Sequence, residues 1–358
     1  MNQHNGNAAD ASAAAQDPRL KRYVRQWRYP PLGPEGQKRL LESRVLLCGC
    51  GALGTVLANT LARAGVGFLR IVDRDFLELS NLQRQVLFDE DDVAAGLPKA
   101  VAAVEKLKRI NSEIEYEPVV TDVDHTNIDQ LASDVDLLLD GTDNFETRFL
   151  LNDYSQHKKV PWVYGGCLGA EGQTLTILPG ETPCLRCLIS DPPPPGESPT
   201  CDTAGILGPI INIVASLQAA EAIKILSGNR QAVNRKWTII SLWDNTLRQM
   251  DVSSLAETGC ATCRGGDYPW LSGRRGSHTA VLCGRNSVQL VPPERHQLSL
   301  EALAQKLQGV GTVTRNKFLL RLEVPDYQIT VFPDGRAIVG GTDDIPTAKT
   351  VYARYIGS

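Results

Sequence analysis

A glycine-rich loop between two apolar segments constrains the fold of this chain most. Residues 48–54 read CGCGALG and contain the pattern G-x-G-x-x-G at Gly49, Gly51 and Gly54. An apolar run precedes the loop, a helical pattern follows it, and Asp73 ends the next apolar run. This order of strand, loop, helix and strand is typical of a dinucleotide-binding turn, in which a helix N-terminus receives phosphate. The loop alone does not say which nucleotide binds.

Strand and helix patterns alternate along the chain. Apolar runs such as RVLLC and FLRIV are separated by amphipathic stretches such as AVAAVEKLKRI. The alternation predicts an α/β fold, Rossmann-like, with a mostly parallel sheet and helices on both faces. Residues 205–228 read as a long helix that is apolar nearly all round, so we expect it to be buried in the core or at a subunit interface.

Shifts in composition divide the chain into segments. Residues 1–19 are polar and rich in alanine and asparagine, which predicts a disordered tail. We expect a first domain over residues 20–265 and a linker rich in glycine and arginine over residues 266–278. Residues 279–358 predict a small C-terminal α+β module.

The bulk composition argues against several classes of protein. A net charge of -4 gives no reason to expect a nucleic-acid partner. No apolar run reaches the roughly 18 residues that a membrane helix needs, so we expect no membrane partner. The N-terminus has no basic start followed by an apolar stretch, as a signal peptide would. We therefore expect a cytoplasmic protein.

Two cationic side chains follow the glycine loop at places where a nucleotide could reach them. Arg84, in LSNLQRQVLF with Asn81, comes after the second strand, and its planar fork suits phosphate oxygens. An arginine in a polar loop is also common as an exposed surface residue with no functional role. Lys99 follows Pro98 in the first turn of a helix, where it opposes the helix dipole unless it meets an anion.

A carboxylate pair follows the next apolar strand, in LLLDGTDN. Asp140 and Asp143 lie at its end, and a carboxylate beside a bound triphosphate is a natural ligand of Mg²⁺. The simpler alternative is a helix N-cap. The set of loop, arginine, lysine and aspartate suits ATP and Mg²⁺ better than hydride transfer, and we find no histidine placed as the acid or base of a dehydrogenase.

The nine cysteines favour metal or thiol chemistry over disulfides. Two C-x-x-C pairs, CLRC and CATC, predict a tetrahedral zinc site; a redox dithiol or four unrelated thiols are the alternatives. The proposed ligands are Cys184, Cys187, Cys260 and Cys263. Cys201 precedes the long apolar helix, where a thiol is expected to be nucleophilic, although a buried packing role is equally common.

Together these motifs resemble a known family. RYVRQ, CGCGALG, IVDRD, NLQRQ, LPKA, DGTDN, PCLRC, PTCDTAGILGPI and SLQAAEAIKIL follow the order and spacing of the MoeB/ThiF family, bacterial relatives of ubiquitin-activating enzymes. The resemblance covers roughly residues 20–265. It implies an enzyme, an adenylyltransferase that uses ATP and Mg²⁺ on the C-terminal glycine of a ubiquitin-like sulfur-carrier protein. A sulfur donor, a cysteine desulfurase or a rhodanese, would then form the thiocarboxylate.

The resemblance also implies a role for each site residue. Gly49, Gly51 and Gly54 would line the nucleotide, Asp73 would hold the ribose, Asn81, Arg84 and Lys99 would contact the phosphates, and Asp143 would hold Mg²⁺. Arg25, in RYVRQ, matches an arginine that reaches the ATP site of the other subunit, which implies a homodimer. The four paired cysteines match the family's zinc site, and Cys201 matches a crossover-loop cysteine whose covalent role differs between members.

Several alternatives stay open at this point. An NAD-dependent oxidoreductase would need only the glycine loop and Asp73, and a non-enzymatic scaffold would need only a degenerate ATP site. The carrier could be of the molybdopterin-synthase small-subunit type or of the thiamin type. The C-terminal module lacks the usual rhodanese loop around Cys283, so its role, and that of this cysteine, is open.

Overall fold

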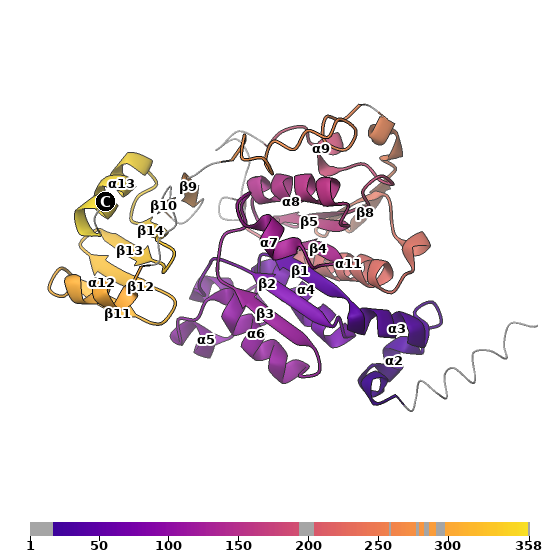
Figure 1. Cartoon of the computed structure of the whole chain (residues 1–358), viewed down its shortest axis with the longest axis horizontal. Coiled ribbons are helices and arrows are strands. Elements are labelled where there is room, and N and C mark those ends of the chain that lie inside the picture. Colours follow the sequence, from indigo (N-terminus) through magenta and orange to yellow (C-terminus); the bar gives the residue numbers. More distant parts are fainter. Residues whose placement is uncertain are drawn as a thin grey trace, which may run out of the picture. The chain divides into compact units, whose positions relative to one another are not determined.

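The computed structural model describes residues 17–192, 204–257, 259–276, 279–282, 286–290 and 298–356. The chain divides into two compact units (Figure 1). The first ends at Arg274, and the second comprises the chain after Arg274 together with residues 204–205. The tail expected over residues 1–19 lies mostly outside the described residues. Its last two residues already belong to a 3-10 helix, η1 (Pro18–Tyr23), which buries Leu20.

An eight-stranded sheet forms the centre of the first unit, in the order β3-β2-β1-β4-β5-β6-β7-β8. Its strands are β1 (Arg44–Cys48), β2 (Phe68–Val72), β3 (Glu115–Val119), β4 (Leu137–Asp140), β5 (Trp162–Leu168), β6 (Glu171–Ile177), β7 (Trp237–Ser241) and β8 (Thr246–Met250). Neighbouring strands are parallel from β3 to β5 and antiparallel from β5 to β8. The predicted mostly parallel sheet is confirmed, with an antiparallel extension at one side.

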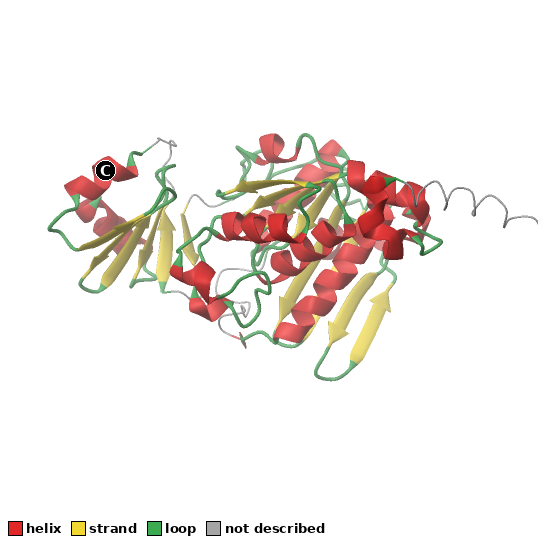
Figure 2. Cartoon of the chain, turned by 90° about the horizontal axis from the view of Figure 1, so that it is seen from below, coloured by secondary structure: helices red, strands yellow, loops and turns green. Residues whose placement is uncertain are grey.

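Helices cover both faces of this sheet (Figure 2). Alternate residues of β1 explain why: Val45 and Leu47 belong to one buried cluster, and Leu46 and Cys48 belong to the other. On the first face lie α3 (Gly33–Glu42), α4 (Ala52–Ala64), α6 (Lys99–Ile110) and α11 (Gly208–Leu226). On the second face lie α7 (Ile128–Ala132), α8 (Phe145–Lys158) and α9 (Leu185–Leu188).

Shorter elements connect these layers. They are α2 (Val24–Trp27), η2 (Leu79–Asn81), α5 (Glu90–Ala94), η3 (Arg230–Ala232) and η4 (Ser253–Glu257). Contrary to the expectation that no segment reaches membrane-helix length, the helix α11 is long and apolar enough to cross a membrane by length and composition alone. However, Ile210, Val214 and Ala215 are buried in the first-face core, where Val214 packs against Gly172 of β6. We interpret α11 as a core helix, one of the two positions expected for it.

The strand order reverses beside β1. The chain runs from β1 to β2 and β3 on one side and then crosses to β4 on the other side. The carboxyl ends of β1 and β4 therefore meet at a topological switch point, which is where ligands bind in open α/β sheets. The glycine loop follows β1, and the segment with Asp143 follows β4, so the fold places both at this edge.

The first unit extends further than expected. Residues 266–274, which we expected to be part of a linker, belong to it. Trp270 is buried and stacks on Phe149 of α8, with ring centroids 4.4 Å apart. Its backbone N–H donates to Asp153, at 2.9 Å. An aromatic anchor of this kind lies far from its partners in sequence, so composition alone did not reveal it.

The described residues of the second unit include an antiparallel sheet and helices. The strand order is β11-β12-β13-β14-β10-β9. The strands are β9 (Thr279–Leu282), β10 (Ser287–Leu290), β11 (Thr312–Arg315), β12 (Leu320–Val324), β13 (Tyr327–Val331) and β14 (Ala337–Gly340), and the helices are α12 (Leu300–Lys306) and α13 (Ile345–Tyr355). The α+β character agrees with the expectation.

Candidate nucleotide site and metal centre

The glycine loop owes its shape to close backbone approaches. Gly49 has φ of +87°, a left-handed conformation that favours glycine. A Cβ atom on Gly54 would lie 2.0 Å from the Gly49 carbonyl oxygen, and one on Gly141 would lie 2.5 Å from that oxygen. At Gly51 the nearest atom to a Cβ would be the Gln85 amide nitrogen, at 3.9 Å. Gly49 and Gly54 are therefore needed for the close backbone packing of the loop. Gly51 instead leaves open space at the start of α4.

The start of α4 has donors for an anion. Gly51 is the N-cap and provides no side-chain hydrogen bond to the first turn. The first N–H groups of a helix have no partner within the helix, and the helix dipole favours negative charge beside them. Phosphate groups are therefore suited to this position.

Both carboxylate oxygens of Asp73 accept a backbone hydrogen bond, and one of these bonds comes from the glycine loop. Oδ2 accepts from the backbone N–H of Cys50 at 2.6 Å, and Oδ1 accepts from the N–H of Asp75 at 2.7 Å. Burial raises the pKa of Asp73, and the charge of Lys99 opposes that shift. Each oxygen retains a second lone pair, so the carboxylate can still accept from a ribose hydroxyl.

The predicted phosphate-contacting residues lie on segments that meet at this edge. Lys99 begins α6 and is buried, with only 4% of its side chain exposed and its Nζ 3.0 Å from Asp75 Oδ2. Asn81 ends η2 and is buried, and its Oδ1 accepts from the N–H of Glu78 at 3.2 Å. Arg84 is half-buried and donates to the Ser80 carbonyl oxygen.

The two carboxylates after β4 have different environments. Asp140 is fully buried, accepts from the N–H and hydroxyl of Thr142, and pairs with Arg148 at 3.0 Å. Burial raises the pKa of Asp140, and Arg148 opposes that shift. Asp143 is exposed, and Asn144 rather than Asp143 caps α8. Asp143 is thus the carboxylate accessible to a metal ion, and Asp140 shapes the loop that carries it.

Arg25 lies at the wrong end of α4 to reach this site within one chain. The neighbouring Gln26 donates to the carbonyl oxygen of Ala64, the last residue of α4, at 2.8 Å. The glycine loop is at the other end of this 13-residue helix, a distance of about 20 Å at 1.5 Å per residue. Arg25 itself is exposed.

Cys201 lies outside the described residues, as does Cys283. The described chain resumes at residue 204, before the start of α11.

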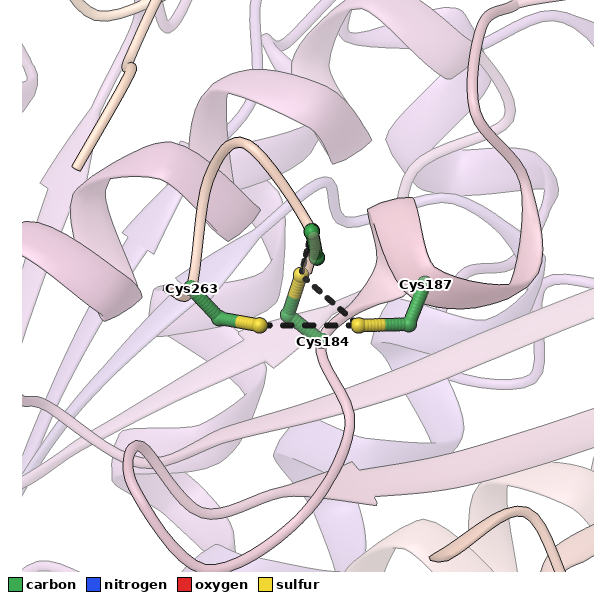
Figure 3. Close-up of side chains that lie close together, drawn as sticks. Cys184, Cys187 and Cys263 are labelled. Carbon is green, nitrogen blue, oxygen red and sulfur yellow. Dashed lines mark hydrogen bonds between the residues drawn. The ribbon is translucent and has the colours of Figure 1, made fainter. Parts of the chain in front are cut away.

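Four cysteines converge in the first unit, as Figure 3 shows for Cys184, Cys187 and Cys263. The Cys184 Sγ lies 3.8 Å from the Cys187 Sγ and 3.7 Å from the Cys260 Sγ. The Sγ atoms of Cys187 and Cys263 are 3.5 Å apart. For Zn–S bonds of about 2.3 Å, a regular tetrahedron places its sulfurs about 3.8 Å apart. The four thiols therefore fit a tetrahedral zinc ion.

The four thiols interact strongly with one another. Hydrogen bonding, first with Cys187, raises the pKa of Cys184, and hydrogen bonding with Cys184 lowers the pKa of Cys263. The cluster joins α9 to the segment after η4, which a second contact also connects: Arg186 donates to the Thr262 hydroxyl at 2.7 Å. The site therefore links segments that are distant in sequence.

Three further residues shape the site and were not among the predicted ones. Asp75 pairs with Lys99, Arg148 fixes the loop before Asp143, and Gln85 is buried beside Gly51. Its Oε1 finds no hydrogen-bond partner among the described residues. The spacing D-x-D in IVDRD was a signal for Asp75; Arg148 lies within a helical pattern and gave none.

Comparison with known proteins yields one family and several close relatives. The ThiF family matches residues 23–262. The sulfur carrier protein ThiS adenylyltransferase of Bacillus subtilis (strain 168) is 44% identical over 338 residues, 94% of this chain and 99% of the relative. The SAMP-activating enzyme E1 of Haloferax volcanii is 41% identical over 228 residues, 64% of this chain and 83% of the relative.

Two further similarities agree with these. The adenylyltransferase and sulfurtransferase MOCS3 of Danio rerio is 41% identical over 253 residues, which are 71% of this chain and 54% of that protein. Among solved structures, E. coli MccB with ATP has a TM-score of 0.60 and 24% identity, covering 70% of this chain and 75% of MccB. That likeness supports the fold alone.

Proposed function

This chain belongs to the ThiF family, and we propose that it adenylates the C-terminal carboxylate of a small ubiquitin-like sulfur-carrier protein ending in Gly-Gly. The predictions of family and of an adenylyltransferase are confirmed by the matches above. The observation that carries the proposal is the meeting of an open glycine loop, Asp73, Lys99 and Asp143 at one edge of the sheet.

In this proposal ATP lies along the switch point. The space at Gly51 and the free N–H groups of α4 receive phosphate, and Asp73 holds the ribose hydroxyls. Lys99, Arg84 and Asn81 contact the phosphates. The two cations, Lys99 and Arg84, offset the negative charge that meets when one anion attacks another, and the neutral Asn81 amide can add a hydrogen bond.

Asp143 is the carboxylate that we assign to Mg²⁺, because it is exposed at the end of β4 while Asp140 is used internally. The metal ion, when bound, neutralises charge on the phosphate oxygens. The chain's own contribution is to hold Asp143 at that edge through Arg148, which donates to the Thr142 carbonyl oxygen at 2.8 Å.

The reaction balances without a general base. A carboxylate oxygen of the carrier's terminal glycine bonds to the α-phosphorus, and the bond from that phosphorus to the bridging oxygen of the β-phosphate breaks. Pyrophosphate leaves with the electron pair, and an acyl-adenylate remains. The carboxylate is already ionised at neutral pH, so the site has to position and stabilise rather than remove a proton.

We assign the carrier to the thiamin type rather than the molybdopterin-synthase type. The Bacillus subtilis relative, named for ThiS, matches 94% of this chain, so the similarity extends into the C-terminal unit. The MOCS3 and SAMP-activating relatives match only 71% and 64% of it.

We also propose a homodimer in which Arg25 completes the partner's site. Its place near the far end of α4, about 20 Å from the glycine loop of its own chain, supports this reading. A symmetric dimer would give both sites the same arginine.

For the later sulfur step we propose that the Cys201 thiolate attacks the carbonyl carbon of the acyl-adenylate, so that a thioester forms and AMP leaves. The terminal sulfur of a persulfide on a sulfur donor, a cysteine desulfurase or a rhodanese, then attacks the thioester and releases the Cys201 thiol. A second thiol reduces the resulting acyl disulfide, which leaves the thiocarboxylate and a disulfide that contains the donor thiol. The Cys201→Ala variant should keep ATP–pyrophosphate exchange and lose thiocarboxylate formation with a physiological donor. Full thiocarboxylate formation in that variant would make the cysteine dispensable.

We place the protein in the cytoplasm, where reduced thiols can hold zinc.

The test of the main proposal is ATP–pyrophosphate exchange with purified full-length protein, ATP, Mg²⁺ and a ThiS-type carrier. Exchange should require the carrier's Gly-Gly end, and a carrier shortened by two residues is the control. Absence of exchange with carriers of both types, alongside reduction or oxidation of NAD, would overturn the proposal in favour of a dehydrogenase.

A further inference from the structure

Asp75 lies at the centre of a connected set of contacts in the nucleotide site. Its backbone N–H donates to Asp73 Oδ1 at 2.7 Å, and its carbonyl oxygen accepts from the N–H of Lys99 at 2.9 Å. Its side-chain Oδ2 accepts from Lys99 Nζ at 3.0 Å. Asp73 in turn accepts from the N–H of Cys50 in the glycine loop. One residue thus joins the ends of β2, the glycine loop and α6.

Lys99 needs such a partner in the absence of nucleotide. Only 4% of its side chain is exposed, and α6 presents the positive end of its dipole to this first-turn residue. A buried ammonium without a counter-charge loses its proton readily, because burial disfavours the charged form. Asp75, with 20% of its side chain exposed, supplies that counter-charge.

Other charged and titratable groups lie around Lys99. Asp73 lies close enough to interact with Lys99 but is engaged by two backbone donors, and its burial favours the protonated form. The Cys50 thiol also faces Lys99, and burial raises its pKa well above the usual range. Arg74 forms the next ion pair outward, with Asp122 at 2.7 Å and Asp75 at 3.7 Å. Of these groups, Asp75 makes the direct contact with the ammonium.

We propose that Asp75 is a positioning residue for adenylation: it keeps Lys99 charged and aimed at the phosphate site in the empty enzyme, and releases it to the triphosphate. This inference rests on the proposed function, because it assigns Lys99 to the phosphates. Asp75 itself does not touch the reacting atoms. Its effect on catalysis passes through the lysine.

The test compares pH profiles. The kcat/KM for ATP in the exchange assay reports ionisations of the free enzyme. In the wild-type enzyme, kcat/KM for ATP should not fall through deprotonation of Lys99 up to about pH 9, because the ion pair with Asp75 keeps the ammonium charged. In the Asp75→Asn variant, kcat/KM for ATP should fall about tenfold between pH 7 and pH 9. A fall of this size is expected when the pKa of the Lys99 ammonium lies about one unit below pH 9. The affinity for ATP–Mg²⁺, measured by isothermal titration without carrier, should weaken in parallel.

Two further variants separate positioning from a structural role. Asp75→Glu should restore the high-pH limb, because it keeps the charge, while lowering kcat through displacement of the carboxylate. The double variant D75N/K99R should have no alkaline loss, because a guanidinium does not deprotonate in this range. The matched control is Asp89→Asn, which removes an exposed partner of Lys106 on the same helix and should leave the profile unchanged.

The outcomes distinguish failure of the Asp75 role from failure of the proposed adenylation. If D75N and D75E both keep the wild-type rate and profile, Asp75 is not a positioning residue. If D75N/K99R still loses activity at pH 9, the loss does not pass through Lys99, and the inference is wrong. Should D75N fail to fold, a wild-type kcat in D75E would refute the positioning role. Lack of exchange in wild type with intact ATP binding would instead overturn the proposed function.

Discussion

Gly54 provides the sharpest test of how the nucleotide loop is built. In most helices, replacing an interior glycine by alanine stabilises by about 0.5–1 kcal/mol. Gly54 lies inside α4, but a Cβ there would lie 2.0 Å from the carbonyl oxygen and 2.8 Å from the carbonyl carbon of Gly49. Both atoms belong to the backbone, so no side-chain rotation relieves the overlap. We expect Gly54→Ala to destabilise the first unit despite the gain in helix propensity.

The magnitude follows from the overlap. Overpacking of a well-packed region typically costs about 1–3 kcal/mol, and a clash with backbone belongs near the upper end. For a unit of this size, about 3 kcal/mol corresponds to a fall in Tm of roughly 6–12 °C. The assay is thermal unfolding of the full chain, followed by circular dichroism and calorimetry, together with titration of ATP–Mg²⁺.

Gly51→Ala is the matched control within the same loop. The nearest atom to its Cβ would be 3.9 Å away, so no clash is expected. Alanine is a poorer N-cap than glycine, which costs about 1 kcal/mol or less. Its methyl group would occupy the open space at the start of α4, so ATP affinity should fall more than stability does. A G54A protein with wild-type Tm and ATP affinity would refute the account of the loop.

Two further measurements test other parts of the first unit. Elemental analysis of protein purified without chelator should find about one zinc per chain, and Cys260→Ser should lower both the zinc content and the Tm; wild-type protein without zinc would contradict the assignment of the four thiols. Burial raises the pKa of Asp153 to about 6. Because the folded state then binds a proton that the unfolded state releases, this residue's contribution to stability is present at low pH and is lost as pH rises from about 4 to about 6. Asp153→Asn should remove this loss, so its free energy of unfolding relative to wild type should rise across that window; a constant difference would contradict the shift.

The elements that the sequence predicted share a local cause. The glycine loop, the strand before it and Asp73 lie within about 30 residues, and each has a residue type that few other structures require there. The zinc ligands are separated by over 70 residues, yet each C-x-x-C pair presents two thiols by local geometry. Local patterns of this kind can be recognised in the sequence without knowledge of the tertiary packing.

The features that the sequence did not reveal depend on contacts between distant segments. Asp140 and Asp143 have the same side chain three residues apart, and only Arg148 and the burial of β4 distinguish the inner from the outer one. The packing of Trp270 on Phe149 crosses more than a hundred residues, and it moved the domain boundary. The pairing of Asp75 with Lys99 likewise requires that β2 and the start of α6 meet.

The proposed sharing of Arg25 between subunits leads to a complementation test. Arg25→Ala should abolish exchange by removing an arginine from the partner's site, and Lys99→Met should abolish it by removing a lysine from its own site. When the two inactive proteins are mixed and allowed to exchange subunits, a mixed dimer contains one site with Lys99 from the first protein and Arg25 from the second. Random pairing makes about half of the dimers mixed, each with one intact site of two, so activity should recover to about a quarter of wild type. If Arg25 acted within its own chain, every site in the mixture would lack one of the two cations, and no activity would return. Mixing Lys99→Met with Arg84→Ala is the control, because both residues are assigned to the same chain's site and no subunit arrangement restores it.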